Sequence, residues 1–282
     1  MGDRGRFFYP NRMGRIILRT MEELIGKQEL DAILREGGLE MYIGRYPPSD
    51  LEKGFPFEHL SALQAAVEAV HGPEAGRELN RRVGQRCLDN GLREFNPLLG
   101  IADLPVRMMP LSLKLHVGFD VFAMVFNRFT DQVVTLSEDQ QHYYWIIERC
   151  PVCWGRQTEG PCCHLAVGIL EESLRWASGG KSFLVAETSC IAQGAATCTI
   201  AIGKRPVAGG GRVAGEHGVG RPPRAPGALS FLALVYSGWP PSAASSFSSG
   251  RGSTRPFHCG SPTGSCRVSQ YSSRPLPSGS AK

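Results

Sequence analysis

The chain has 282 residues, of which 42% are hydrophobic and 20% charged, a composition that suits one good-sized globular domain or two small ones. Its formal net charge of +5 is unevenly placed: residues 206–282 hold eight basic side chains and one acidic side chain, a balance of +7, which leaves −2 for residues 1–205. A mildly acidic folded part lacks the basic face that nucleic-acid binding requires, so no nucleic-acid partner is expected.

Two features predict a soluble, cytoplasmic protein. The segment Met1–Gly14 is charged and aromatic and has no apolar core of the kind found in signal peptides. The longest apolar run, Leu229–Tyr236, is too short to span a bilayer. We therefore expect no membrane span.

Residues 1–131 are predicted to be largely helical. Apolar side chains recur at helical spacing, and Gly37-Gly38, Tyr46-Pro47-Pro48 and Gly72-Pro73 interrupt the pattern. Helices are expected at Met13–Leu24, Asp31–Glu36, His59–Val70, Glu74–Phe95 and Leu111–Phe129.

After Asp131 the apolar pattern changes to alternation, which predicts strands. A hairpin is expected from Gln132–Ser137 and Gln141–Arg149, and a second from Ser182–Glu187 and Cys198–Ile202. The helix His164–Ala177, ended by Gly179-Gly180, separates them. The predicted fold class is α+β, with N-terminal helices followed by an antiparallel sheet that one helix crosses.

The composition changes again near Pro206. Of the last 77 residues, 38 are Gly, Pro or Ser, and such a segment buries too little apolar surface to offset the entropy of ordering it. We therefore expect one folded domain over residues 1–205 and a disordered tail over 206–282. Both a native flexible tail and the product of a shifted reading frame remain open for this segment.

Six of the nine cysteines lie within the stretch 150–198. In a chain without a secretory signal, clustered cysteines are more often metal ligands than disulfides. Glu187 ends one predicted strand, Cys190 lies in the turn, and Cys198 begins the next strand. A hairpin therefore brings the three residues together. Cys163, at the start of the preceding helix, is the best fourth ligand, and this donor set suits a structural Zn²⁺ ion. The competing interpretation is a set of buried free thiols.

The pair Cys150 and Cys153 has several interpretations. A CxxC pair can be half of a zinc site, a redox dithiol or two buried thiols. It could form a second metal site or exchange ligands with the first. Cys162 is interpreted as an incidental neighbour of Cys163.

The metal pattern resembles a known family. A C-x4-G…E-x2-C-x3-G-x3-C pattern is filled by Cys163, Gly168, Glu187, Cys190, Gly194 and Cys198. It is similar to the 4-vinyl reductase (4VR) domain, also called the hydrocarbon-binding domain, over residues 145–204. Phrases such as Tyr9-Pro10-Asn11, Glu52–Phe57 and Cys150–Arg156 resemble uncharacterised bacterial members and extend the likeness to 7–205.

This resemblance implies a fold shared with trafficking-complex subunits and nitric-oxide-sensor-like domains, a homodimer, and a buried pocket for a small apolar ligand. It also implies a structural zinc held by Cys163, Glu187, Cys190 and Cys198. The expected function is a zinc-stabilised domain that binds and senses a small hydrophobic or aromatic molecule. The alternative is an accessory protein or enzyme of tetrapyrrole (bacteriochlorophyll) vinyl reduction. One residue is inserted between Cys163 and Glu187, at Ser178–Gly180.

No catalytic residue is assigned, because the sequence has no nucleophile motif with supporting context, no phosphate-binding loop and no dinucleotide fingerprint. Large side chains on the helix 111–129 and the strand 141–149 are the candidates for a pocket lining; the alternative is ordinary core packing. The candidates are His116, Phe119, Phe122, Phe126, His142, Tyr144 and Trp145.

Overall fold

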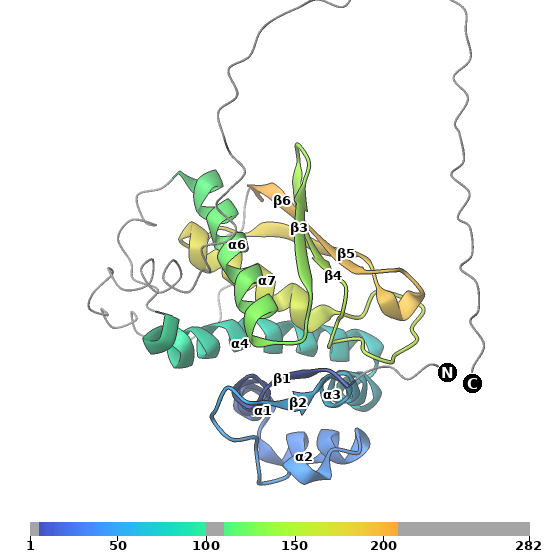
Figure 1. Ribbon diagram of the computed structural model, residues 1–282. Helices are drawn as coiled ribbons and strands as arrows, with labels where there is room; N and C mark the ends of the chain where they lie inside the picture. The colour runs from blue at the N-terminus through green and yellow to red at the C-terminus, as the bar shows by residue number, and fades with distance from the viewer. Residues whose placement is uncertain (1–5, 100–109, 208–282) are drawn as a thin grey trace, which may run out of the picture. The chain divides into compact units, whose positions relative to one another are not determined.

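The computed structural model describes residues 6–99 and 110–207. The architecture is α+β, as predicted: helices dominate the N-terminal half and a four-stranded antiparallel sheet the C-terminal half (Figure 1). The helices are α1 (Asn11–Ile25), α2 (Lys27–Glu36), α3 (Phe57–His71), α4 (Pro73–Leu99), α6 (Leu111–Phe129) and α7 (His164–Ser178). The short 3-10 helices η1 and η2 span Glu40–Tyr42 and Ile191–Gln193.

A two-stranded ribbon in the helical half was not predicted from the sequence. Strands β1 (Phe8–Pro10) and β2 (Lys53–Pro56) pair in antiparallel fashion and lead directly into α1 and α3. Both strands end in a proline, which cannot donate a ladder hydrogen bond and favours the start of the following helix. Strands this short carry too little alternation to be recognised from the sequence.

The sheet has the strand order β3-β4-β6-β5, and every neighbouring pair is antiparallel. Its strands are β3 (Val134–Glu138), β4 (His142–Ile147), β5 (Phe183–Ser189) and β6 (Cys198–Pro206). Both predicted hairpins, 132–149 and 182–202, are therefore present. The helix between them ends as predicted, with Gly179 in the left-handed conformation at its C-terminus.

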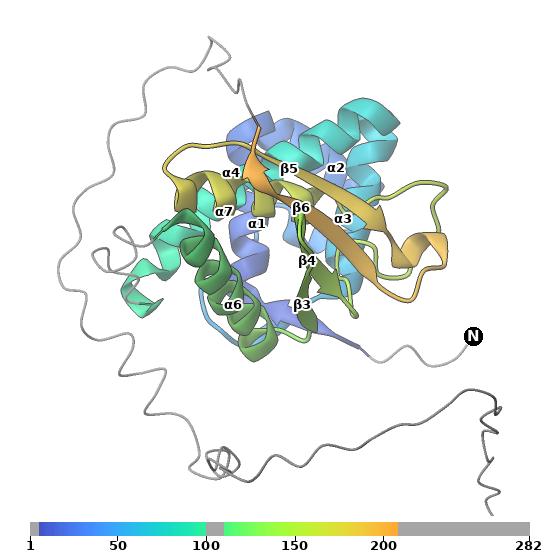
Figure 2. The same ribbon diagram turned by 90° about the horizontal axis from the view of Figure 1, so that it is seen from above.

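Helices α6 and α7 contact each other and cover the sheet, α6 along β3 and α7 along β5 (Figure 2). The face of the sheet that meets them holds the buried residues Trp145, Ile147, Ile200 and Ile202. On the opposite face Leu184 is exposed. Successive side chains of a strand point to opposite faces, which places these residues inside and Leu184 outside.

The closest helix packing joins α4 to α7, where two glycines let the backbones touch. A Cβ atom on Gly168 would lie 1.9 Å from the carbonyl oxygen of Arg81, and a Cβ atom on Gly84 would lie 2.2 Å from that of Leu165. Only hydrogen can occupy those positions. Gly168 of the metal pattern therefore has a structural reason: it seats α7, and with it Cys163, against α4.

The predicted tail begins at residue 206, and residues 208–282 lie outside the described part of the chain. Strand β6 continues to Pro206, four residues beyond the predicted end at Ile202. Within 6–99 and 110–207, no helix has the length and apolar character needed to cross a membrane.

Candidate metal centre

The loop between β4 and α7 carries four of the six clustered cysteines. Cys150 and Cys153 follow the end of β4, and Cys162 and Cys163 immediately precede the first turn of α7. The other two, Cys190 and Cys198, flank η2 between β5 and β6. All six side chains are buried, each at most 2% exposed.

The sheet register explains why the two halves of the cluster meet. Ile147, the last residue of β4, pairs with Cys198, the first residue of β6, so the β4–α7 loop begins beside the β5–β6 turn. Glu187 lies across β6 from this point, at the irregularity of β5 between Glu187 and Ser189. Three strand ends and one helix start therefore converge on the same buried position.

The four residues proposed from the sequence as zinc ligands do come together. Ligand atoms of Cys163, Glu187, Cys190 and Cys198 all lie within 4.8 Å of one another. The Sγ atoms of Cys163 and Cys198 are 3.7 Å apart, and each is 3.9 Å from Cys190 Sγ. Tetrahedral zinc with Zn–S bonds of about 2.3 Å requires sulfur–sulfur edges of about 3.8 Å. These separations exceed the disulfide bond length of about 2.05 Å, and all six cysteines are free.

Glu187 has one carboxylate oxygen without a partner. Its Oε2 atom accepts a hydrogen bond of 2.8 Å from the backbone N–H of Cys163, whereas its Oε1 atom is buried and makes no hydrogen bond. Burial raises the pKa of the Glu187 carboxyl to about 8. A buried carboxylate oxygen left unpaired costs free energy, and a cation bound at this position would offset that cost.

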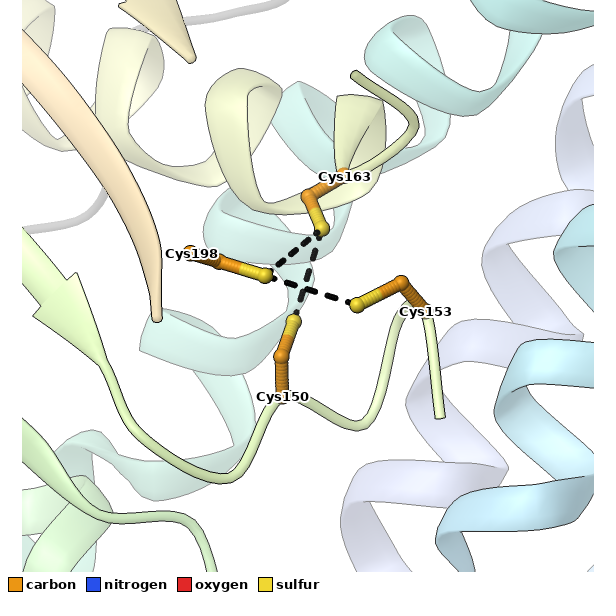
Figure 3. A group of neighbouring side chains, drawn as sticks. All are labelled: Cys150, Cys153, Cys163 and Cys198. Atoms are coloured by element: carbon orange, nitrogen blue, oxygen red, sulfur yellow. Dashed lines mark hydrogen bonds between the residues drawn. The ribbon is translucent and has the colours of Figure 1, made fainter. Parts of the chain in front are cut away.

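A second group of four ligand atoms overlaps the first. The Sγ atoms of Cys150, Cys153, Cys163 and Cys198 also lie within 4.8 Å of one another and converge on one point (Figure 3). Cys150 Sγ is 3.5 Å from Cys163 Sγ, and Cys153 Sγ is 3.4 Å from Cys198 Sγ. The CxxC pair, for which the sequence left open a second metal site or ligand exchange with the first, thus belongs to the same buried cluster.

Cys162 also contacts this cluster, although sequence reasoning left it without a role. It is 2% exposed, and its Sγ atom is 3.8 Å from Cys190 Sγ. It belongs to neither group of four. The C-x4-G spacing to Gly168 selects Cys163 as the ligand, but it does not indicate that the adjacent Cys162 side chain is also buried beside the cluster.

Polar and aromatic contacts hold the cluster loop against the helical half. The Arg156 guanidinium donates to Glu68 of α3 at 2.8 Å, and both side chains are largely buried. Trp154 packs edge-on against Phe7 and Phe57, with ring centroids 5.1 and 6.0 Å away. The backbone N–H of Ile191 donates to Cys198 Sγ at 3.2 Å, the kind of bond that favours a thiolate. The cluster therefore lies at the junction of loop, sheet and helices.

The structure unites part of the predicted pocket lining. Phe119, Phe122 and Phe126 of α6 surround Trp145 of β4, with ring centroids 5.4–6.4 Å from the indole. His116, at the exposed end of this layer, faces Tyr143 at 6.5 Å.

Two predicted pocket residues lie elsewhere. His142 and Tyr144 are on the opposite face of β4 from Trp145, where Tyr144 Oη donates to Asp139 Oδ2 at 2.7 Å. Tyr143 takes the position expected of Tyr144 and packs on Phe119 at 5.3 Å. The aromatic layer is thus Phe119, Phe122, Phe126, Tyr143 and Trp145, and a pocket within it remains a prediction.

Comparison with known proteins gives structural matches only. No protein-family model matches the chain, and no curated protein matches it. Solved structures similar to it include an H-NOX protein from a study of H-NOX activation, with 16% identity, 71% of this chain and 98% of that chain covered, and a TM-score of 0.44. Another is the unliganded Fe(II) H-NOX protein from K. algicida, with 13% identity, 70% and 96% coverage, and a TM-score of 0.46.

A third is the H-NOX protein from S. oneidensis in its Fe(II)NO state, with 15% identity, 66% and 96% coverage, and a TM-score of 0.44. Similarity at this level of identity and TM-score carries no argument about ligand, cofactor or activity. The 4VR resemblance is neither confirmed nor excluded by these matches.

Proposed function

We propose that this domain is a small-molecule-binding sensory domain whose fold is stabilised by a structural zinc ion. The ion is held by Cys163, Glu187, Cys190 and Cys198, called here the carboxylate site. The observation that carries the proposal is the buried, unpartnered Oε1 atom of Glu187 beside three buried thiols at tetrahedral spacing.

Zinc is the metal that fits this donor set best. Thiolates select soft or borderline ions, and a mixed sulfur and oxygen set with four ligands suits tetrahedral Zn²⁺. Four protein ligands leave no open position for water, so the ion supports a structural role. The site joins the start of α7 to the β5–β6 hairpin, and binding energy at such a site contributes directly to folding.

The aromatic layer is the proposed ligand-binding region. Phe119 and Trp145 are buried, whereas Phe122 and Phe126 are only partly buried at its edge. Partly buried rings can turn aside at lower cost than rings packed on all sides. A small apolar or aromatic molecule would enter between α6 and β4 by displacing the rings of Phe122 and Phe126. The 4VR resemblance supports the same assignment and also a homodimer.

The metal is tested on full-length protein purified without added metal. Native mass spectrometry and elemental analysis should find zinc, and a strong chelator should unfold the domain, as followed by far-UV circular dichroism. The same spectra report the oligomeric state and any retained small molecule. A metal-free protein that is fully folded at neutral pH would contradict the zinc assignment.

The ligand is tested with toluene and phenol as probes. Binding of a probe should raise the melting temperature. Phe122→Ala should reduce this increase. Tyr144→Phe, on the other face of β4, should leave the increase unchanged. No shift with any aromatic probe would contradict the sensory role. A purified protein that carries a tetrapyrrole, visible by its absorbance, would favour the vinyl-reduction alternative instead.

A further inference from the structure

We propose that the cluster holds a second zinc ion, bound by Cys150 and Cys153 and by the shared thiolates of Cys163 and Cys198. The two ions would form a thiolate-bridged dinuclear centre. This inference rests on the zinc proposed above for the carboxylate site and extends it to the thiols that this site leaves unused.

The geometry supports a shared edge. The two groups of four ligand atoms have Cys163 and Cys198 in common, and these two sulfurs are 3.7 Å apart. In two tetrahedra that share one edge, two ligands bridge both metal ions. Each ion has two further ligands that bind it alone. Figure 3 shows Cys150 and Cys153 around the shared pair Cys163 and Cys198, where they would complete one tetrahedron. Glu187 and Cys190 would complete the other.

The charge balance does not oppose the second ion. One Zn²⁺ with three thiolates and a carboxylate has a formal charge of −2; two Zn²⁺ with five thiolates and that carboxylate also have −2. The two positive charges of the added ion are matched by the two protons that Cys150 and Cys153 release on binding. The buried site therefore gains an ion without gaining net charge, which keeps the desolvation cost from rising.

Without the second ion, the Cys150 and Cys153 thiols would be buried against an anionic zinc site. Thiols are weak hydrogen-bond donors, and each of these two has sulfur neighbours, at 3.5 and 3.4 Å. An iron–sulfur cluster fits less well, because its thiolates surround a core of iron and inorganic sulfide. Four sulfurs within 4.8 Å of one another leave room for a single ion between them and not for such a core.

The test uses the full-length chain and measures metal stoichiometry by native mass spectrometry and elemental analysis. Wild-type protein should bind two zinc ions, and the double variant Cys150→Ser/Cys153→Ser should bind one. Cys162→Ser is the matched control, because Cys162 is equally buried beside the cluster and belongs to neither group; it should keep two ions. Cys259→Ser/Cys266→Ser, outside the described residues, should also keep two.

Cadmium-113 NMR tests the shared thiolates directly. Wild-type protein loaded with ¹¹³Cd should give two resonances that are coupled to each other through the bridging sulfurs. Two uncoupled resonances would overturn the bridge. Should the double variant fail to fold, the wild-type stoichiometry and this coupling still decide the question.

The possible stoichiometries separate the two proposals. One zinc ion per wild-type chain that the Cys150→Ser/Cys153→Ser variant retains, with unfolding on chelation, would overturn the second ion and leave the carboxylate site standing. One zinc ion that this variant loses would overturn both assignments. No bound metal in a folded chain would overturn both. Two ions retained by the Cys150→Ser/Cys153→Ser variant would overturn the assignment of these ligands.

Discussion

The thiol cluster and the aromatic layer both lie where the sheet meets the helices, and they are built differently. Ligands of the cluster come from strand ends and a helix start, and its cysteines are all at most 2% exposed. The aromatic layer depends on α6, of which only Leu115, Phe119 and Ala123 are buried, while Leu113 is 48% exposed. The cluster is enclosed throughout, whereas the aromatic layer is buried at Phe119 and Trp145 and partly open at its edge.

This difference suggests a division of roles. A fully enclosed cluster that joins three elements can only hold the fold together, because any movement breaks several contacts at once. The Arg156–Glu68 ion pair transmits that restraint to α3. The partly buried rings at the edge of the aromatic layer have fewer packing partners and can rearrange at lower cost. The two proposed roles divide accordingly, with stability proposed for the cluster and ligand response for the layer.

The largest expected effect is on the cluster. Cys198→Ser removes a ligand common to both groups, so it should abolish zinc binding and leave no stable fold, since structural zinc contributes roughly 10 kcal/mol or more in small domains. Circular dichroism measures the loss of folded structure, and elemental analysis measures the loss of zinc. Cys87→Ala is the control: Cys87 is buried in α4 away from the cluster, and this variant should fold and keep its metal. A folded, metal-loaded Cys198→Ser protein would contradict a stabilising role for the cluster.

The next effect is on the aromatic layer. Trp145→Ala removes the ring around which three phenylalanines pack and should cost about 3–5 kcal/mol, as buried large-to-small changes do. Urea denaturation in the presence of excess zinc measures the loss. The metal content of the folded variant should stay at the wild-type value. A simultaneous loss of metal would show that the two regions are not independent.

A smaller effect is expected where α7 meets α4. Gly168→Ala places a methyl group against the Arg81 carbonyl and should cost about 1–3 kcal/mol, the range for overpacked interiors. Gly91→Ala is the matched control in α4, because a Cβ atom there meets nothing within 4 Å. Urea denaturation of both variants should show a loss for the first and none for the second. If the Gly168→Ala and Gly91→Ala proteins were equally stable, α4 and α7 would be able to move apart at this contact without loss of stability.

Sequence reasoning reached the part of the metal centre that local structure determines. Glu187, Cys190 and Cys198 lie on one hairpin, and the hairpin alone brings them together. Cys150 and Cys153 join the same cluster because Ile147 of β4 pairs with Cys198 of β6. These two residues are 51 positions apart in the chain. Spacing rules contain no information on such a register.

The aromatic layer shows a different limit. Both faces of β4 carry large residues, so alternation alone could not tell which face meets α6. In the structure Tyr143 and Trp145 face α6. Tyr144, one residue further along the strand than Tyr143, lies on the opposite face and contacts Asp139. The boundaries of α6 at Leu111 and Phe129, in contrast, were predicted to the residue because Pro110 marks its start.

The smallest expected effect tests whether the outer side of α6 is free in solution. Gly118 lies within α6, is exposed, and a Cβ atom there would meet nothing within 4 Å. Gly118→Ala should therefore stabilise the domain by up to about 1 kcal/mol, because alanine restricts the unfolded chain and favours helix. Urea denaturation at low protein concentration measures the gain. A loss that grows with protein concentration would instead mean that a second copy covers this side of α6, which would place the aromatic layer at a dimer interface.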